Sequence, residues 1–137
     1  MKVVLNSDFG GFSLSNKAFE RLIELGFPYI LEKDRIKEDF SEENLKIIIF
    51  DKTEDDLLGT KYHILENSYE VEDLRSHPLV VQVVEELRRL AWGNFAELEI
   101  VEIPDGIDWG IVNNEGIEWI IDWDTEGRVL YHRTKHI

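Results

Sequence analysis

A pair of glycines between two phenylalanines, Phe9-Gly10-Gly11-Phe12, is the segment of this sequence best suited to hold a ligand. It follows an apolar segment, Lys2 to Leu5, that predicts a strand, and it precedes a predicted helix over Asn16 to Leu25. Glycines there can expose backbone N–H groups, and a helix start capped by Ser13 or Ser15 adds its positive dipole end. Such a junction can hold an anion or a nucleotide. The alternative is a tight turn whose two phenylalanines pack into the core.

A second cluster, formed by His132, Arg133 and His136, lies near the end of the sequence. Histidines four residues apart share a face only if the segment is helical, and no third metal ligand can be named. A frayed tail or a hairpin edge is therefore the favoured interpretation, and we expect no metal site. Arg133 could pair with a carboxylate or clamp a phosphate.

Trp92 and Asn94 follow the second predicted helix and are further candidates for ligand contact. The Trp92 ring could stack on a purine, although such aromatic residues more often belong to a core or an interface. The Asn94 amide could read a base edge, or the residue could end the helix in a left-handed turn.

Catalytic patterns are sparse. The acidic pairs Asp105 with Asp108 and Asp122 with Asp124 come with no matching base or nucleophile motif. The sequence has no Gly-x-Ser-x-Gly, Walker or His-Glu-x-x-His motif, and Gly10-Gly11 lacks the further glycine of a dinucleotide fingerprint. We therefore expect a protein that is not an enzyme and that uses no cofactor.

The sequence is strongly acidic: its 137 residues include 29 Asp and Glu against 15 Lys and Arg, a net charge of −14. This charge repels a phosphate backbone, because nucleic-acid binding needs Lys and Arg to replace condensed cations. We expect no direct contact with nucleic acid. The same charge suits a protein that imitates DNA in a basic groove, although most acidic surfaces only keep proteins soluble.

The length allows one hydrophobic core and is short for two, which predicts a single domain over residues 1–137. No stretch approaches the ~20 apolar residues of a membrane span, and the first residues do not resemble a signal peptide. The absence of cysteine excludes disulfides and cysteine nucleophiles. These features favour a cytoplasmic protein without membrane contact.

Periodicity predicts the first helix to end at Gly26 and a second helix to begin near Pro78, include Leu90 and stop at Trp92. Charged residues 32–44 indicate an exposed loop or a short surface helix. Further strands are predicted over Lys46 to Phe50, Tyr62 to Leu65, Phe95 to Ile103, Trp109 to Val112, Glu118 to Asp122 and Val129 to His132. The last four form a predicted meander. The fold class is therefore α+β, a largely antiparallel sheet with two main helices packed on it.

Segments at both ends and in the middle of the sequence also follow a shared pattern: Lys2 to Asn6, Phe9 to Ser15, His77 to Val80, Val83 to Leu87, Gly93 to Ala96, Leu98 to Asp105 and His132 to Thr134. In these segments the sequence resembles a family of small tailed-phage and prophage proteins, many without an assigned activity. Residues 27–74 match poorly, which is where such proteins vary.

Among phage accessory proteins of this size, the sequence is similar to the Thoeris anti-defence proteins. These are non-enzymatic oligomers that sequester cyclic ADP-ribose-type immune signals and, in some cases, cyclic oligonucleotides. The resemblance implies pockets between subunits, with phosphates gripped by a glycine-aromatic loop and an arginine. The ligand-contact role that the resemblance implies falls on Phe9, Gly10, Gly11 and Phe12 in the loop, and on Asn94 and Arg133. The acidic composition departs from what an anionic ligand requires.

Two hypotheses follow. In the first, the chain is a host-cytoplasmic phage or prophage protein, an oligomer that binds and sequesters a cyclic nucleotide immune signal and so counters anti-phage defence. Its contacts would be the backbone of Gly10 and Gly11, Arg133, and rings such as Phe9, Phe12 or Trp92. In the second, an acidic surface imitates DNA or otherwise inhibits a basic host protein that binds nucleic acid.

Overall fold

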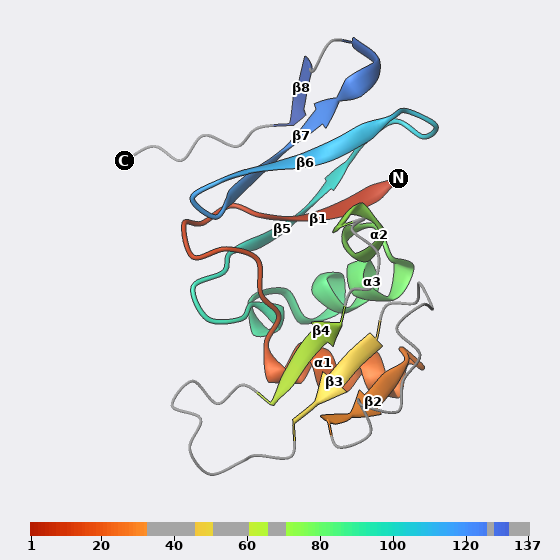
Figure 1. Cartoon of the computed structure of the whole chain (residues 1–137), viewed down its shortest axis with the longest axis vertical. Helices are drawn as coiled ribbons and strands as arrows, with labels where there is room; N and C mark the ends of the chain where they lie inside the picture. The colour runs from red at the N-terminus through yellow and green to blue at the C-terminus, as the bar shows by residue number, and fades with distance from the viewer. Residues whose placement is uncertain (33–45, 51–60, 66–70, 126–127, 132–137) are drawn as a thin grey trace.

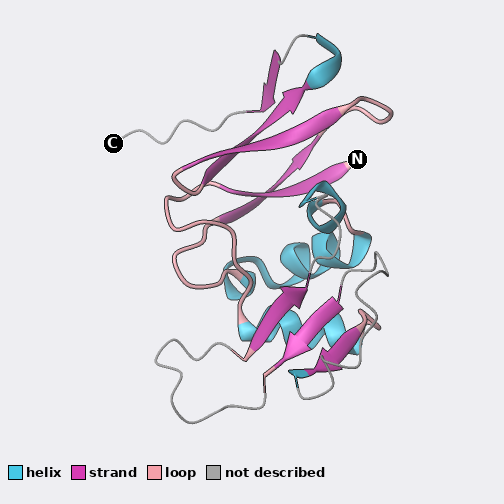
Figure 2. Ribbon diagram, viewed as in Figure 1, coloured by secondary structure: helices cyan, strands magenta, loops and turns pink. Residues whose placement is uncertain are grey.

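The computed structural model describes residues 1–32, 46–50, 61–65, 71–125 and 128–131 (Figure 1). Its strands are β1 (Lys2–Asn6), β2 (Tyr29–Leu31), β3 (Lys46–Ile49), β4 (Tyr62–Leu65), β5 (Leu98–Glu102), β6 (Trp109–Asn114), β7 (Ile117–Asp122) and β8 (Arg128–Tyr131). Its α-helices are α1 (Asn16–Glu24), α2 (Val71–Arg75) and α3 (Pro78–Leu87), and the 3₁₀ turns η2 (Arg88–Ala91) and η3 (Trp123–Thr125) follow α3 and β7. The predicted α+β class is confirmed (Figure 2).

Helix α1 forms where the sequence predicts it. The Ser15 hydroxyl caps its first turn by accepting a hydrogen bond from the Ala18 N–H at 3.1 Å. Its apolar face buries Ala18, Phe19 and Leu22 in the core.

Helix α3 begins at Pro78, as predicted, and the His77 ring caps it by accepting a hydrogen bond from the Leu79 N–H at 3.1 Å. The α-helix ends at Leu87, earlier than the predicted stop at Trp92, because Arg88 takes a positive φ of 53°. The chain continues through η2 to Trp92.

The described strands form three small sheets instead of the single sheet that the sequence predicts. Strands β1 and β5 pair antiparallel, β2 and β3 pair parallel with β4 antiparallel to β3, and β6, β7 and β8 form an antiparallel sheet. The predicted meander is therefore wrong at its first step, since β5 pairs with β1 and not with β6. Strand β2 and helix α2, which are only 3 and 5 residues long, were not among the predicted elements.

The ribbon of β1 and β5 lies between the helices on one side and the sheet of β6, β7 and β8 on the other (Figure 1). An apolar cluster covers each of its faces. Val4 and Leu98 point to the cluster that includes α1, α3 and β3, while Val3, Leu5 and Val101 point to the cluster that includes Ile120 of β7. Alternate residues of β1 therefore face opposite cores. Burial on both faces explains why β1 and β5 pair with each other in the middle of the protein. No helix in the described parts of the chain is long and apolar enough to cross a membrane.

Candidate functional site

The glycine-aromatic loop, residues 8–12, is wedged between two turns of distant sequence. On one side is the β6–β7 turn, where a Cβ on Gly116 would overlap the Phe9 carbonyl oxygen and lie 2.6 Å from the Gly11 nitrogen. On the other is the turn after η2, where a Cβ on Gly10 would overlap Phe95. Gly10 and Gly116 are therefore required for close packing of three backbone segments.

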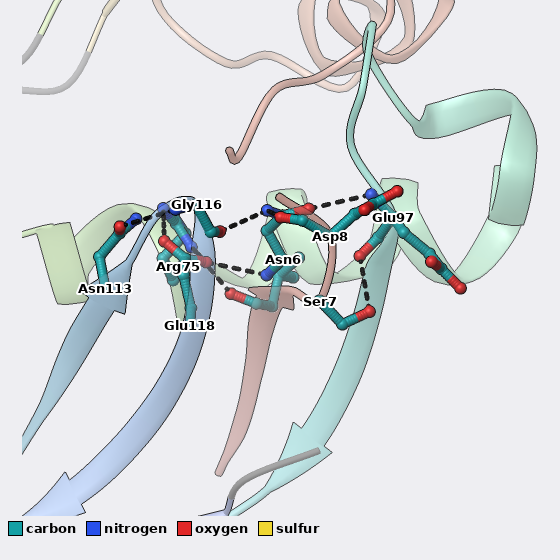
Figure 3. A network of polar contacts seen from close by, with 9 residues as sticks. Asn6, Ser7, Asp8, Arg75, Glu97, Asn113, Gly116 and Glu118 are labelled. Atoms are coloured by element: carbon teal, nitrogen blue, oxygen red, sulfur yellow. Dashed lines mark hydrogen bonds and ion pairs between the residues drawn. The ribbon is translucent and has the colours of Figure 1, made fainter. Parts of the chain in front are cut away.

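Asn6, at the end of β1, holds the start of this loop (Figure 3). Its buried side-chain amide donates hydrogen bonds of 2.6 Å to the carbonyl oxygens of Asp8 and Gly116, and its side-chain oxygen accepts one of 2.9 Å from the Glu97 N–H. One side chain thus joins the loop, the β6–β7 turn and the approach to β5. Because all three bonds are partly shielded from solvent, they favour a single loop position.

Beneath the loop, Arg75 of α2 and Glu118 of β7 form a buried ion pair (Figure 3). The two Arg75 Nη atoms lie 2.5 and 2.7 Å from the two Glu118 carboxylate oxygens, and the side chains are only 6% and 4% exposed. Glu118 also accepts a 2.8 Å hydrogen bond from the Asn6 N–H, and Arg75 donates one of 3.3 Å to the Val4 carbonyl oxygen. The bidentate pair fixes the relative position of α2, β1 and β7.

The Phe12 ring, at the other end of the loop, lies over the Arg75 guanidinium, with the central carbon 3.6 Å from the ring centroid. This is a cation–π contact at close range. Phe12 is also packed against the main core. One face of the ring is therefore already covered, and the Arg75 charge is already neutralised by Glu118.

The segment after Phe12 runs beside the turn that follows η2. Gly93 donates a backbone hydrogen bond to the Ser13 carbonyl at 3.0 Å, and the Ser13 hydroxyl donates one to the Asn94 carbonyl at 3.1 Å. Leu14 and Trp92 form an antiparallel bridge, and Trp92 packs against the main core. This pairing brings Asn94 to the loop.

Phe95 has an unusual combination of backbone conformation and exposure. Its φ is +65°, in the left-handed region, and its side chain is 74% exposed. A residue with a Cβ in this region costs about 1–2 kcal/mol, and an exposed ring recovers little of that cost by burial. Phe9, directly before the Gly10 that contacts Phe95, is 60% exposed. The protein thus presents two aromatic side chains to solvent next to Gly10.

The backbone of Gly10 and Gly11 also offers hydrogen-bond donors. Within the part of the chain that the structure describes, the N–H groups of Gly10 and Gly11 make no hydrogen bond, and Gly11 has a φ of +85°. The Phe9 N–H is taken by the Asp8 carboxylate at 2.8 Å. Neutral donors and exposed rings therefore occur together, in an acidic setting that includes Asp8 and the exposed Glu115.

The structure brings together Phe9, Gly10, Gly11 and Asn94 from the predicted set. It places Phe12 on Arg75 and Trp92 against the core, so these two rings are committed to internal contacts. Arg133, like His132 and His136, lies outside the described residues. The first turn of α1 is capped by the Ser15 hydroxyl, which accepts a hydrogen bond from the Ala18 N–H. Ser15 lies three residues beyond Phe12.

Sequence reasoning missed Phe95, Arg75 and Glu118. For Phe95 the only local signal was the turn predicted by Gly93-Asn94 directly before it, and such a signal places positive φ on Gly or Asn and not on Phe. For the ion pair no local pattern existed, since its members are 43 residues apart. No protein-family model, curated protein or solved structure matches this chain. The interpretation of the site therefore depends on its geometry.

Proposed function

We propose that this chain binds a small nucleotide-type ligand at the loop of residues 8–12 and sequesters it without chemical change. The observation that carries the proposal is Phe95, which is held in a left-handed conformation with its ring exposed and which packs against Gly10, next to the exposed Phe9. A strained residue that contributes little burial is typical of a functional position. Exposed rings can stack on a base, because every base offers a flat π-face.

The neutral donors indicate what else the ligand carries. Backbone N–H groups at Gly10 and Gly11 suit an anionic or carbonyl oxygen, as backbone amides do in many phosphate sites. Hydrogen bonds act at short range, whereas the net charge of −14 acts at long range and repels polyanions. A compact nucleotide with few charges therefore fits this site better than a nucleic-acid strand.

Binding without turnover is favoured by the groups around the loop. The described residues that frame it include glycines, phenylalanines, asparagines and serines together with the exposed Glu115, and the Asp8 carboxylate within the loop already accepts the Phe9 N–H. This arrangement offers no nucleophile paired with a base. Together with the resemblance to phage anti-defence proteins, it supports sequestration of a cyclic ADP-ribose-type immune signal in the host cytoplasm by a homo-oligomer.

A thermal-shift panel tests the proposal. Purified chain is mixed with cyclic ADP-ribose isomers and cyclic oligonucleotides, where a ligand at 100 times its Kd stabilises the fold by about 2.7 kcal/mol. The ligand is then recovered after denaturation and its mass measured. Phe9→Ala and Phe95→Asn should reduce the shift, while Tyr29→Ala, a change at an exposed aromatic residue on β2, should keep it. A panel without any shift would contradict the proposal.

A second candidate is an acidic inhibitor of a basic host protein, and the carboxylates near the exposed rings favour it. Aromatic anchors within a charged rim are typical of protein interfaces. This function predicts that the chain releases duplex DNA from a basic DNA-binding protein, less effectively as salt rises from about 50 to 200 mM. It also predicts no thermal shift with nucleotides.

A further inference from the structure

We infer that Arg75 is a positioning residue for the proposed binding loop, acting from beneath it through contacts at both ends. The inference depends on the proposed function for its meaning, because positioning a loop matters only if the loop binds. Arg75 is buried and was not among the site residues predicted from the sequence.

The first route leads to the start of the loop. Arg75 holds Glu118 through both carboxylate oxygens, and one of these oxygens accepts the Asn6 N–H at 2.8 Å. The Asn6 side chain then bonds the Asp8 and Gly116 carbonyl oxygens. A change in the Arg75–Glu118 geometry therefore shifts Asn6, which holds the Asp8 carbonyl oxygen.

The second route leads to the end of the loop. The Phe12 ring lies 3.6 Å above the guanidinium carbon, so the flat surface of Arg75 supports it directly. The Nε of Arg75 is buried and has no hydrogen-bond partner among the described groups, which leaves Glu118 and Val4 to set the guanidinium plane. The same side chain thus orients both ends of a segment that contains Gly10 and Gly11.

The substitution Arg75→Lys separates the positioning role of Arg75 from its charge. Lysine keeps one positive charge near Glu118 but has no planar fork for two parallel hydrogen bonds and no flat surface for Phe12. Phe12→Leu breaks only the second route and leaves the ion pair in place. Arg21→Lys is the matched control, because Arg21 forms an ion pair with Glu86 between α1 and α3, on the surface.

The experiment uses fluorine NMR of the full chain with 4-fluorophenylalanine at position 9. A second preparation carries the label at position 29, on β2, as a distant reference. We expect one sharp signal from position 9 in the parent chain, and several or broadened signals in Arg75→Lys and Phe12→Leu. The position 29 signal should stay unchanged. Arg21→Lys should leave both signals as in the parent chain.

Binding supplies the second readout. For any nucleotide that the parent chain binds, Arg75→Lys and Phe12→Leu should raise Kd at least tenfold, and Arg21→Lys should not. An unchanged position 9 signal in folded variants would overturn the inference, as would equal changes at positions 9 and 29, which indicate general loosening. If Arg75→Lys does not fold, the position 9 signal of Phe12→Leu decides whether the inference holds. If no nucleotide binds, the proposed function fails, and the fluorine signals still decide the positioning.

Discussion

Arg75 and Glu118 together occupy the free edge of β1 in the way that a neighbouring strand would. The Val4 carbonyl and the Asn6 N–H point to the same edge, away from β5, because the groups that pair with β5 belong to alternate residues such as Ser7, whose N–H donates to Glu97. Arg75 donates to that carbonyl and Glu118 accepts from that N–H. A residue in a parallel strand makes the same two contacts. The ion pair therefore satisfies a buried edge that no described strand covers.

Removing one member of this pair should be costly. Arg75→Met leaves the Glu118 carboxylate buried without its cation, for which about 3–5 kcal/mol of unfolding free energy is expected. The double variant Arg75→Met/Glu118→Met should lose less than Arg75→Met alone, because no uncompensated charge remains. Urea unfolding followed by far-UV circular dichroism measures both. A loss under about 1 kcal/mol in Arg75→Met would contradict the account of the edge.

Close packing at Gly116 can be separated from its backbone conformation. Gly116 and Gly106 have φ values of 96° and 78°, but only at Gly116 would a Cβ overlap other backbone atoms, while Gly106 has open space around it. Gly106→Ala should cost about 1–2 kcal/mol from left-handed strain alone. Gly116→Ala should cost clearly more. Equal losses in thermal unfolding would mean that the loop yields to the added methyl group.

Relieving the strain at Phe95 should stabilise the protein. Asn tolerates the left-handed region better than Phe, so Phe95→Asn should raise the unfolding free energy by about 0.5–1 kcal/mol. The same change should weaken binding of a stacked base by about 1–3 kcal/mol, roughly 5- to 150-fold in Kd. Calorimetric unfolding and titration on the same sample test both effects. A destabilised Phe95→Asn would indicate that this ring supports the fold.

Acid should weaken the start of α3. Burial lowers the pKa of His77 below its ordinary value of 6.5, and the neutral ring accepts the Leu79 N–H and lies 5.0 Å from the Phe27 ring. The unfolded chain takes up the proton first, so this stability is fully present above pH 6.5 and is lost as the pH falls through the lowered folded pKa. His77→Asn, a cap that does not titrate, should have a flatter stability profile from pH 7.5 to 5.5. Parallel profiles for the two proteins would refute the role of His77.

Local signals predicted the elements that depend on local contacts. Ser15 with the apolar spacing to Leu25 located α1, and Asn113-Asn114-Glu115-Gly116 located the β6–β7 hairpin, because caps and two-residue turns are specified within a few residues. The pairing of β5 with β1 was missed, since it depends on burial between two cores that form only in the folded chain. The short parallel strand β2 had too little pattern to stand out.

The candidate site was predicted in part for the same reason. Phe9, Gly10 and Gly11 are adjacent in the sequence, and their types alone suggested a loop with exposed backbone. Part of what supports that loop comes from distant sequence. Gly116 and Phe95 pack against it, and Glu118 holds the neighbouring Asn6, through contacts across about 85 to 110 residues. Such contacts leave no signal in a single sequence. Phe12 and Trp92 can contact a ligand only through a ring face that the internal contacts leave exposed. Their role in ligand contact remains a prediction.

The most direct test follows the glycine amides during a titration. Amide NMR spectra of ¹⁵N-labelled chain resolve its 9 glycines in a characteristic region, and each nucleotide of the panel is added in turn. We expect a bound nucleotide to shift the Gly10 and Gly11 signals and to leave the Gly106 signal in place. Phe95→Asn should weaken that response. A panel in which no nucleotide moves Gly10 or Gly11, or one in which binding moves only glycines outside this loop, would contradict the proposed site.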